Sequence, residues 1–170
     1  CQRMMWRDGS PIKINYELIC DGGEKEMRVY LDVCCLCRPF DDQSVYRIRQ
    51  ETDAVKEILS RCDKGWELVI SEMTIEEISQ IPDPTRRDRV QPFLNLANKT
   101  IKIDKAIINR MYEIRSMGIK TVDAFHIACA EQVHATLITT DDRLVQVFNQ
   151  DTTQFVIKIK NPVHLLEEDS

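Results

Sequence analysis

Four carboxylate side chains follow apolar segments or begin helical ones, and together they could hold a divalent cation. Asp32 ends one apolar segment, Glu77 follows a second, Asp123 stands near the start of a helical segment, and Asp141 directly follows residues 137–140. Clustered carboxylates repel one another, which raises their pKa values. Mg2+ and Mn2+ prefer oxygen ligands and relieve this repulsion. Because such a metal lowers the pKa of a bound water and holds a phosphate oxygen, the set predicts phosphodiester hydrolysis.

Most of these acids also have a purely structural interpretation. Thr74 and Glu77 have the spacing of a capping box, so Glu77 could simply close the start of a helix. Asp123 and Asp141 lie near expected helix N-termini, where the helix dipole favours negative charge. Asp32 differs because it interrupts an apolar strand, and a buried carboxylate without a partner is costly.

The elements that must position these acids are strands that alternate with helices. Apolar runs predict strands at residues 27–35, 66–70, 100–103, 136–140 and 155–159. Helical spacing and capping residues predict helices at residues 45–62, 74–81, 85–98, 104–118, 121–134 and 141–148. This alternation favours an α/β fold with a mainly parallel sheet covered by helices on both faces. Ligands in such folds bind beyond the carboxyl ends of the strands, where we expect the four acids.

Length and composition predict one globular domain. The chain has 170 residues, of which 43% are hydrophobic, and a net charge of -5. It is therefore not a bulk-basic nucleic-acid binder, although a local basic patch or a bound metal can still hold phosphate. The 7 cysteines lack the second paired knuckle of a structural zinc site, so we interpret them as small buried hydrophobes. With no apolar segment typical of a secretory signal or membrane span, we expect a cytoplasmic protein.

Residues 1–26 differ from the rest of the chain. They contain turn-like Asp-Gly-Ser-Pro and Asp-Gly-Gly sequences ahead of the first clear strand. We interpret them as a leader that is a vector remnant, the result of an over-long gene start, or an added strand around residues 14–19. The domain is then expected at residues 27–166, with a tail at residues 167–170.

Four segments resemble, in chain order, the motifs of the PIN domain family, which includes the VapC-type toxins of toxin–antitoxin pairs. Residues 29–33 are similar to the opening strand with its acid, and in residues 70–78 a serine precedes Glu77 by six positions. Residues 121–128 resemble the Asp-Ala-x-His-x-Ala helix start, and residues 137–144 resemble a strand followed by Thr-x-Asp. The resemblance spans about residues 27–162. It departs from the family at Cys34-Cys35-Leu36-Cys37 and at the leader.

The resemblance implies a three-layer α/β/α fold and an Mg2+- or Mn2+-dependent endoribonuclease that hydrolyses single-stranded RNA, leaving 5′-phosphate and 3′-hydroxyl ends. Asp32, Glu77, Asp123 and Asp141 would be its metal ligands and catalytic residues. It also implies a homodimer and an antitoxin partner whose basic segment enters the acidic site. The alternative is a catalytically inactive PIN module that binds RNA or protein.

Several further residues could assist such a site. Ser71 and Thr139 could hydrogen-bond the acids or metal-bound waters, although both are equally ordinary as strand-end caps. Asp142 could help as an additional acid, and Arg38 and Arg143 could reach a phosphate. His126 could orient Asp123, but a packed core histidine is the expected interpretation.

Rival enzyme classes fit the sequence less well. A haloacid-type phosphatase requires Asp-x-Asp after the first strand, whereas Asp32 is followed by Val33 and Cys34. A receiver domain requires paired acids on one strand and a late lysine, but Asp141 and Asp142 come too late in the strand order.

Overall fold

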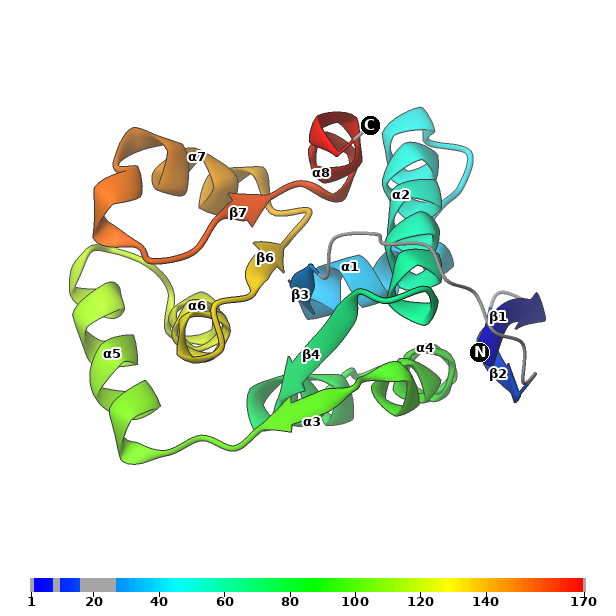
Figure 1. Ribbon diagram of the computed structural model, residues 1–170, viewed down its shortest axis with the longest axis horizontal. Coiled ribbons are helices and arrows are strands. Elements are labelled where there is room, and N and C mark those ends of the chain that lie inside the picture. Colours follow the sequence, from blue (N-terminus) through cyan, green and yellow to red (C-terminus); the bar gives the residue numbers. More distant parts are fainter. Residues whose placement is uncertain (1, 8–9, 16–26, 170) are drawn as a thin grey trace.

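The computed structural model describes residues 2–7, 10–15 and 27–169, with side chains from Met27 onward, and it confirms the α/β fold. Five parallel strands form one sheet in the order β5-β4-β3-β6-β7 (Figure 1). The strands are β3 (Arg28–Leu31), β4 (Glu67–Ser71), β5 (Lys99–Ile101), β6 (Thr136–Ile138) and β7 (Ile159–Lys160).

Helices cover both faces of this sheet and complete three layers. Within the described residues they are α1 (Val33–Cys37), α2 (Tyr46–Asp63), α3 (Glu72–Ser79), α4 (Pro84–Val90), α5 (Lys105–Ser116), α6 (Thr121–Gln132), α7 (Asp142–Gln150) and α8 (Pro162–Glu168). Helices α5, α6 and α7 lie on one face, and α1, α2 and α8 lie on the other (Figure 1). Alternating side chains of β3 reach both cores: Tyr30 packs with α5–α7, while Val29 and Leu31 pack with α1 and α2.

Strand β3 lies at the centre of the sheet, and this position determines which residues meet at its carboxyl edge. The chain runs from β3 through β4 to β5 at one side, then returns to β6 and β7 at the other. The pairing of β3 with β6 continues one residue further, because the Asp32 amide donates to the Ile138 carbonyl at 3.0 Å. The ends of β4, β3 and β6, and the starts of α3, α1 and α7, therefore share one edge.

A separate two-stranded antiparallel sheet precedes the domain. It consists of β1 (Gln2–Arg7) and β2 (Ser10–Asn15). The extra strand expected around residues 14–19 overlaps the end of β2, and residues 16–19 lie outside the described part of the chain.

The expectation that residues 27–35 form one strand was wrong at its second half. Strand β3 ends at Leu31, Asp32 is extended with φ -62° and ψ 150°, and helix α1 begins at Val33. Cys34, Cys35 and Cys37 are therefore helical, not strand core. A short apolar run has the same pattern in a buried strand and in a buried helical turn, so its periodicity cannot distinguish them. The five described cysteines carry free thiols.

Smaller differences occur at three other elements. The single helix expected at residues 85–98 is α4 followed by a 3-10 helix, η2 (Gln91–Leu96), whose first turn contains a proline. The last strand is only Ile159–Lys160, with a 3-10 turn, η3 (Thr152–Gln154), shortly before it. Helix α8 was not predicted, because seven residues after a proline carry little helical signal.

Candidate functional site

Asp32 is held at the carboxyl edge of the sheet by residues from two neighbouring elements. Its carboxylate is buried, and its Oδ2 accepts hydrogen bonds from the Thr139 hydroxyl at 2.8 Å and from the Cys34 thiol at 3.1 Å. The Thr140 amide in turn donates to Cys34 Sγ at 3.3 Å. The partner that a buried Asp32 requires is thus supplied by α1 and by the end of β6. Sequence reasoning missed Cys34, because it had been interpreted as strand core.

Glu77 projects from α3, one and a half turns after the helix begins. Ser71 caps this helix: its hydroxyl accepts from the Thr74 amide, and the Thr74 hydroxyl accepts from the Ser71 amide. The capping box is therefore Ser71–Thr74, and the expected Thr74–Glu77 box was wrong because the helix begins at Glu72. Glu77 is free of capping, and its Oε2 instead lies 2.8 Å from His126 Nε2.

Asp32, Glu77 and His126 form one compact group. Each offers one possible ligand atom, and these atoms lie within 4.8 Å of one another. His126 is fully buried on α6, and its Nε2 lies 3.9 Å from Asp32 Oδ1. Burial lowers the pKa of His126, but the hydrogen bond to Glu77 and the charge of Asp32 outweigh burial and raise the pKa overall. The sequence analysis expected a packed core histidine. His126 is indeed buried, but it also contacts Asp32 and Glu77.

Asp123 and Asp141 lie beside this group without belonging to it. Asp123 occupies the first turn of α6, and Asp141 caps α7 by accepting from the amides of Arg143 and Leu144. Both acids line one small pocket. Burial, together with the negative charges of Asp32 and Asp141, raises the pKa of Asp123. All four predicted acids thus occupy the carboxyl edge of the sheet.

A model of the PIN domain family matches residues 29–148, from β3 to α7. This chain belongs to the PIN domain family. PIN domains are generally nucleases, and members typically bind divalent metals. The matched region includes all four acids of the carboxyl edge.

Solved structures share the PIN fold with this chain at low sequence identity. FitAcB from Neisseria gonorrhoeae is 20% identical with a TM-score of 0.53, covering 80% of this chain and 99% of that chain. VapBC2 from Rickettsia felis, bound to a DNA fragment from their promoter, is 16% identical with a TM-score of 0.54, covering 79% and 98%. A toxin–antitoxin complex from Klebsiella pneumoniae is 21% identical with a TM-score of 0.51, covering 79% and 97%. A search of curated proteins gave no significant match.

The candidate helpers of this PIN domain differ in where they lie. Thr139 contacts Asp32 directly, and its oxygen also accepts from the Asp141 amide at 3.1 Å. Ser71 lies beneath the site, where it contacts Tyr30 rather than an acid. Asp142 is exposed and forms two hydrogen bonds of 2.6 Å with Arg47.

The two arginines expected to bind phosphate have different surroundings. Arg38 is paired with Glu51 at 2.6 Å and with Asp41 at 2.9 Å. Arg143 is exposed and lines the same pocket as Asp123 and Asp141, together with Lys120. Arg143 is therefore the better placed of the two.

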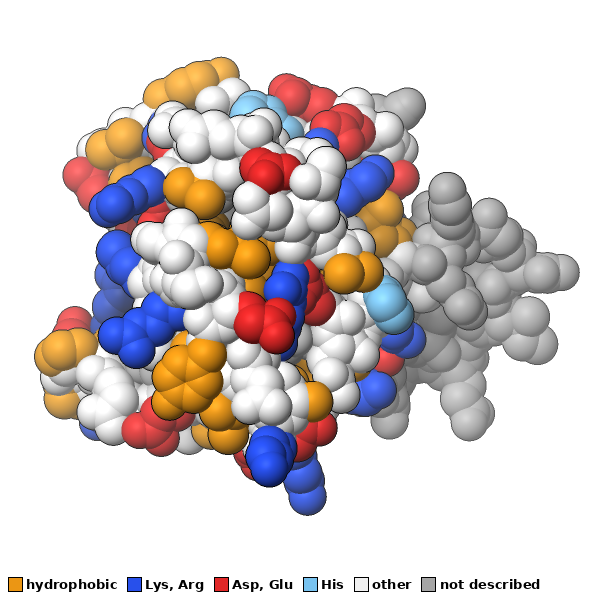
Figure 2. Space-filling model, turned by 90° about the vertical axis from the view of Figure 1, so that its left-hand side faces the viewer, with side chains coloured by type: hydrophobic (Ala, Val, Ile, Leu, Met, Phe, Trp, Pro, Cys, Tyr) orange, Lys and Arg blue, Asp and Glu red, His pale blue; other side chains and the backbone are white. Residues whose placement is uncertain are grey.

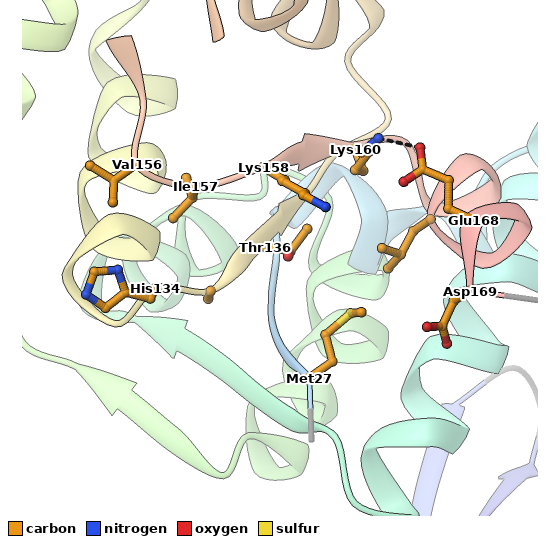
Figure 3. A pocket seen from close by; sticks show the side chains of 11 residues that line it. Met27, His134, Thr136, Val156, Ile157, Lys158, Lys160, Glu168 and Asp169 are labelled. Atoms are coloured by element: carbon orange, nitrogen blue, oxygen red, sulfur yellow. Dashed lines mark hydrogen bonds and ion pairs between the residues drawn. The ribbon is translucent and has the colours of Figure 1, made fainter. Parts of the chain in front are cut away.

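Two hollows of this PIN domain lie at the opposite edge of the sheet. One of these cavities is lined by Met27, which precedes β3, by His134 and Thr136, before and at the start of β6, and by Lys158, which precedes β7 (Figure 3). Lys160 and Glu168, an ion pair, form one side of it. This cavity adjoins the amino ends of the strands, and none of the four acids at the carboxyl edge lines it.

The surface combines charges of both signs. On the face of the molecule that carries α5 and α7, Lys and Arg side chains gather along one edge of the view, and elsewhere acidic, basic and apolar groups alternate (Figure 2). In the part of the chain that the structure describes, none of the helices has the length and apolarity needed to cross a membrane.

Proposed function

We propose that this PIN domain is a metal-dependent endoribonuclease that hydrolyses phosphodiester bonds of single-stranded RNA. The observation that carries the proposal is the group of Asp32, Glu77 and His126 within 4.8 Å, with Asp123 and Asp141 beside it. Such a concentration of carboxylates at a sheet edge has little structural benefit without a cation. The family match supports a nuclease, and the RNA substrate is our inference.

The donor atoms suit a hard divalent cation, Mg2+ or Mn2+. The four acids offer only oxygen, which both metals prefer. The raised pKa of Asp123 reflects burial and the neighbouring charges of Asp32 and Asp141, which a cation would neutralise. Asp32, Glu77, Asp123 and Asp141 would hold the metal. When bound, the metal would lower the pKa of a water and neutralise charge on the phosphate.

The surrounding residues of the chain hold the acids in place. Thr139 and Cys34 fix the Asp32 carboxylate, and the first turn of α7 fixes that of Asp141. One of the four carboxylates would orient the attacking water or accept its proton. Arg143 would contact a phosphate of the strand beside the cut.

The test is cleavage of a labelled single-stranded RNA with Mg2+, with Mn2+ and with EDTA. We expect metal-dependent cutting that leaves 5′-phosphate and 3′-hydroxyl ends. Asp32→Asn and Asp123→Asn keep side-chain shape but remove a ligand charge, so cleavage should fall by orders of magnitude. Asp53→Asn, on the exposed face of α2, is the matched control and should cut normally. Cutting that persists in EDTA would refute the proposal.

The alternative function is binding without cleavage. RNA that binds tightly to the wild type, survives with either metal and binds equally to Asp123→Asn would identify an inactive PIN module. In that case the acidic edge would not catalyse RNA cleavage, and the domain would act by binding RNA.

We also propose an antitoxin-like protein partner. One solved structure with this fold, from Klebsiella pneumoniae, is described as a toxin–antitoxin complex. A basic segment of such a partner would suit the acidic edge, where it would neutralise the carboxylates and block RNA. Co-expression with the product of the neighbouring gene, followed by size-exclusion chromatography with light scattering, measures both this complex and the homodimer.

A further inference from the structure

A buried hydroxyl lies directly beneath the acidic site. Tyr30, on central strand β3, is fully buried, and its Oη has three polar neighbours. Ser71 Oγ lies at 2.6 Å, Thr74 Oγ1 at 2.9 Å and His126 Nδ1 at 2.8 Å. Strand β3, the start of α3 and helix α6 therefore meet at this one oxygen.

The hydrogen-bond partners determine where each proton lies. Ser71 Oγ accepts from the Thr74 amide and Thr74 Oγ1 accepts from the Ser71 amide, so both hydroxyl protons remain available for Tyr30. Burial raises the pKa of Tyr30, which keeps its own proton at neutral pH. With Ser71 and Thr74 donating to its two lone pairs, Tyr30 donates its own proton to Nδ1 of a neutral His126, and a protonated ring donates from Nδ1 to Tyr30 instead.

In either protonation state His126 has a proton on its other ring nitrogen, Nε2. A neutral imidazole that accepts at Nδ1 carries its proton on Nε2, and a protonated imidazole carries one on each nitrogen. Nε2 lies 2.8 Å from Glu77 Oε2, and a carboxylate oxygen only accepts, so Nε2–H donates to Glu77. Both nitrogens of His126 are thus occupied by hydrogen bonds, and neither has a lone pair free for a metal.

We infer that Tyr30 and His126 are positioning residues that hold the Glu77 carboxylate in the site, and that His126 itself is not a metal ligand. This inference deepens the proposed nuclease function and rests on it. Glu77 is a long side chain with a side-chain exposure of 37%, and without a partner it would sample several rotamers. The Ser71–Thr74 capping box, which begins the same helix, also anchors Tyr30. Helix α3 and its N-cap therefore carry both ends of the hydrogen-bonded chain that runs from Ser71 and Thr74 through Tyr30 and His126 to Glu77.

The first test measures the tautomer directly and needs no activity. In 15N-histidine NMR spectra recorded at a pH where the imidazole is neutral, we expect His126 as the Nε2–H tautomer, with its signal assigned through His126→Gln. Addition of Mg2+ should leave that tautomer unchanged. Tyr30→Phe, which removes only the hydroxyl, should disturb the Nδ1 signal. A lone Nδ1–H tautomer, or loss of the Nε2 proton when Mg2+ binds, would identify His126 as a ligand and overturn the inference.

The second test separates positioning from mere structural support. We expect Tyr30→Phe and His126→Leu to weaken Mg2+ binding and to lower kcat by roughly tenfold or more, in the range known for groups that orient metal ligands. KM for RNA should change little, because neither residue touches substrate. His126→Gln, whose amide can still donate to Glu77, should recover part of the loss. Tyr112→Phe and His164→Gln, both at exposed positions, serve as controls.

The outcomes of these tests are distinguishable from failure of the nuclease proposal. If the wild type cuts no RNA, the proposed function fails, while the tautomer and the Mg2+ titration still test the positioning role. If the wild type cuts RNA but His126→Leu has wild-type Mg2+ affinity and kcat, the positioning role is refuted. A loss in His126→Leu that His126→Gln does not reduce at all would also count against it.

Discussion

The hydroxyl of Thr139 donates a 2.8 Å hydrogen bond to Oδ2 of Asp32, so the end of β6 fixes the acid at the end of β3. Thr139 is completely buried, and its oxygen also accepts from the Asp141 amide. One side chain thereby sets the positions of two acids that lie far apart in the sequence.

Replacing Thr139 should therefore weaken the metal site without dismantling the fold. Thr139→Val keeps the shape but removes the donor to Asp32, and we expect Mg2+ affinity to fall by ~10–100-fold. Isothermal titration calorimetry measures this change. Thr152→Val, at an exposed position, is the control. Equal affinities in Thr139→Val and wild type would show that the hydrogen bond has no influence on the site.

The charge of Asp123 should destabilise the protein when no metal is present. The pKa of this carboxyl is raised by burial and by the charges of Asp32 and Asp141, so its ionised form is less favourable in the folded state than in the unfolded chain. Neutral Asp123→Asn should accordingly raise Tm in EDTA at pH 7. The expected rise is a few degrees, since ~1 kcal/mol shifts Tm by roughly 2–4 °C in a domain of this size.

Mg2+ should make the wild type more stable than Asp123→Asn, the reverse of the order expected in EDTA. The metal binds the folded wild type and raises its Tm by mass action, but Asp123→Asn should respond weakly. Differential scanning fluorimetry with and without millimolar Mg2+ measures both effects. A Tm for Asp123→Asn below that of the wild type in EDTA would contradict the proposed repulsion.

Glu51 is predicted to be important for stability rather than for RNA cleavage. Its carboxylate is buried between Arg38 at 2.6 Å and Arg47 at 2.9 Å, and Asn161 donates to it at 3.1 Å. Removing one partner of a buried ion pair typically destabilises by ~3–5 kcal/mol. Because Arg47 is half exposed, we expect Glu51→Gln to reach only the lower part of that range or less.

Urea denaturation of Glu51→Gln measures this loss. Glu57→Gln, on the same helix but exposed and paired with Arg61, should change the free energy of unfolding by less than ~1 kcal/mol. If the two variants lost the same small amount, Glu51 would have no special role in joining α2 to the segment before α8.

Arg143 and Arg38 should have different effects on RNA. Arg143 lines the pocket of Asp123 and Asp141, so Arg143→Gln should raise KM several-fold and weaken the salt dependence of binding. Arg38 is already paired with Glu51 and Asp41, so Arg38→Gln should lower stability while leaving KM nearly unchanged. Binding titrations at two salt concentrations, together with melting curves, separate these results. A larger KM effect from Arg38→Gln would reverse the assignment.

The fold was largely predictable because most of its elements have local signals. Asp104 was expected to cap a helix, and its carboxylate accepts from the Ile107 amide at the start of α5. Gly118, expected to end that helix, has a φ of +88°, which favours glycine. Helix α1 was not predictable in the same way, because its five apolar residues look alike as strand or helix.

Only those site residues that belong to local sequence motifs could be predicted. Asp32, Glu77, Asp123 and Asp141 were identified from their places after strands and at helix starts, and the structure brings them to one edge. The contact of His126 with Glu77 and Tyr30 depends on how α6, α3 and β3 pack together, which no local pattern contains. Likewise, the Asp142–Arg47 pair joins residues far apart in the chain, and it gives Asp142 a partner that its sequence neighbours do not suggest.

The strand order has a consequence for how the protein is made. Asp32 is synthesised before β6, which places Thr139 and Asp141 beside it, and β4 and β5 come between them in the chain. A nascent chain cannot assemble the four acids until most of the domain has emerged. If the assembled acids cut RNA, a nascent chain gains this activity only after Asp141, the last of the four, has emerged from the ribosome.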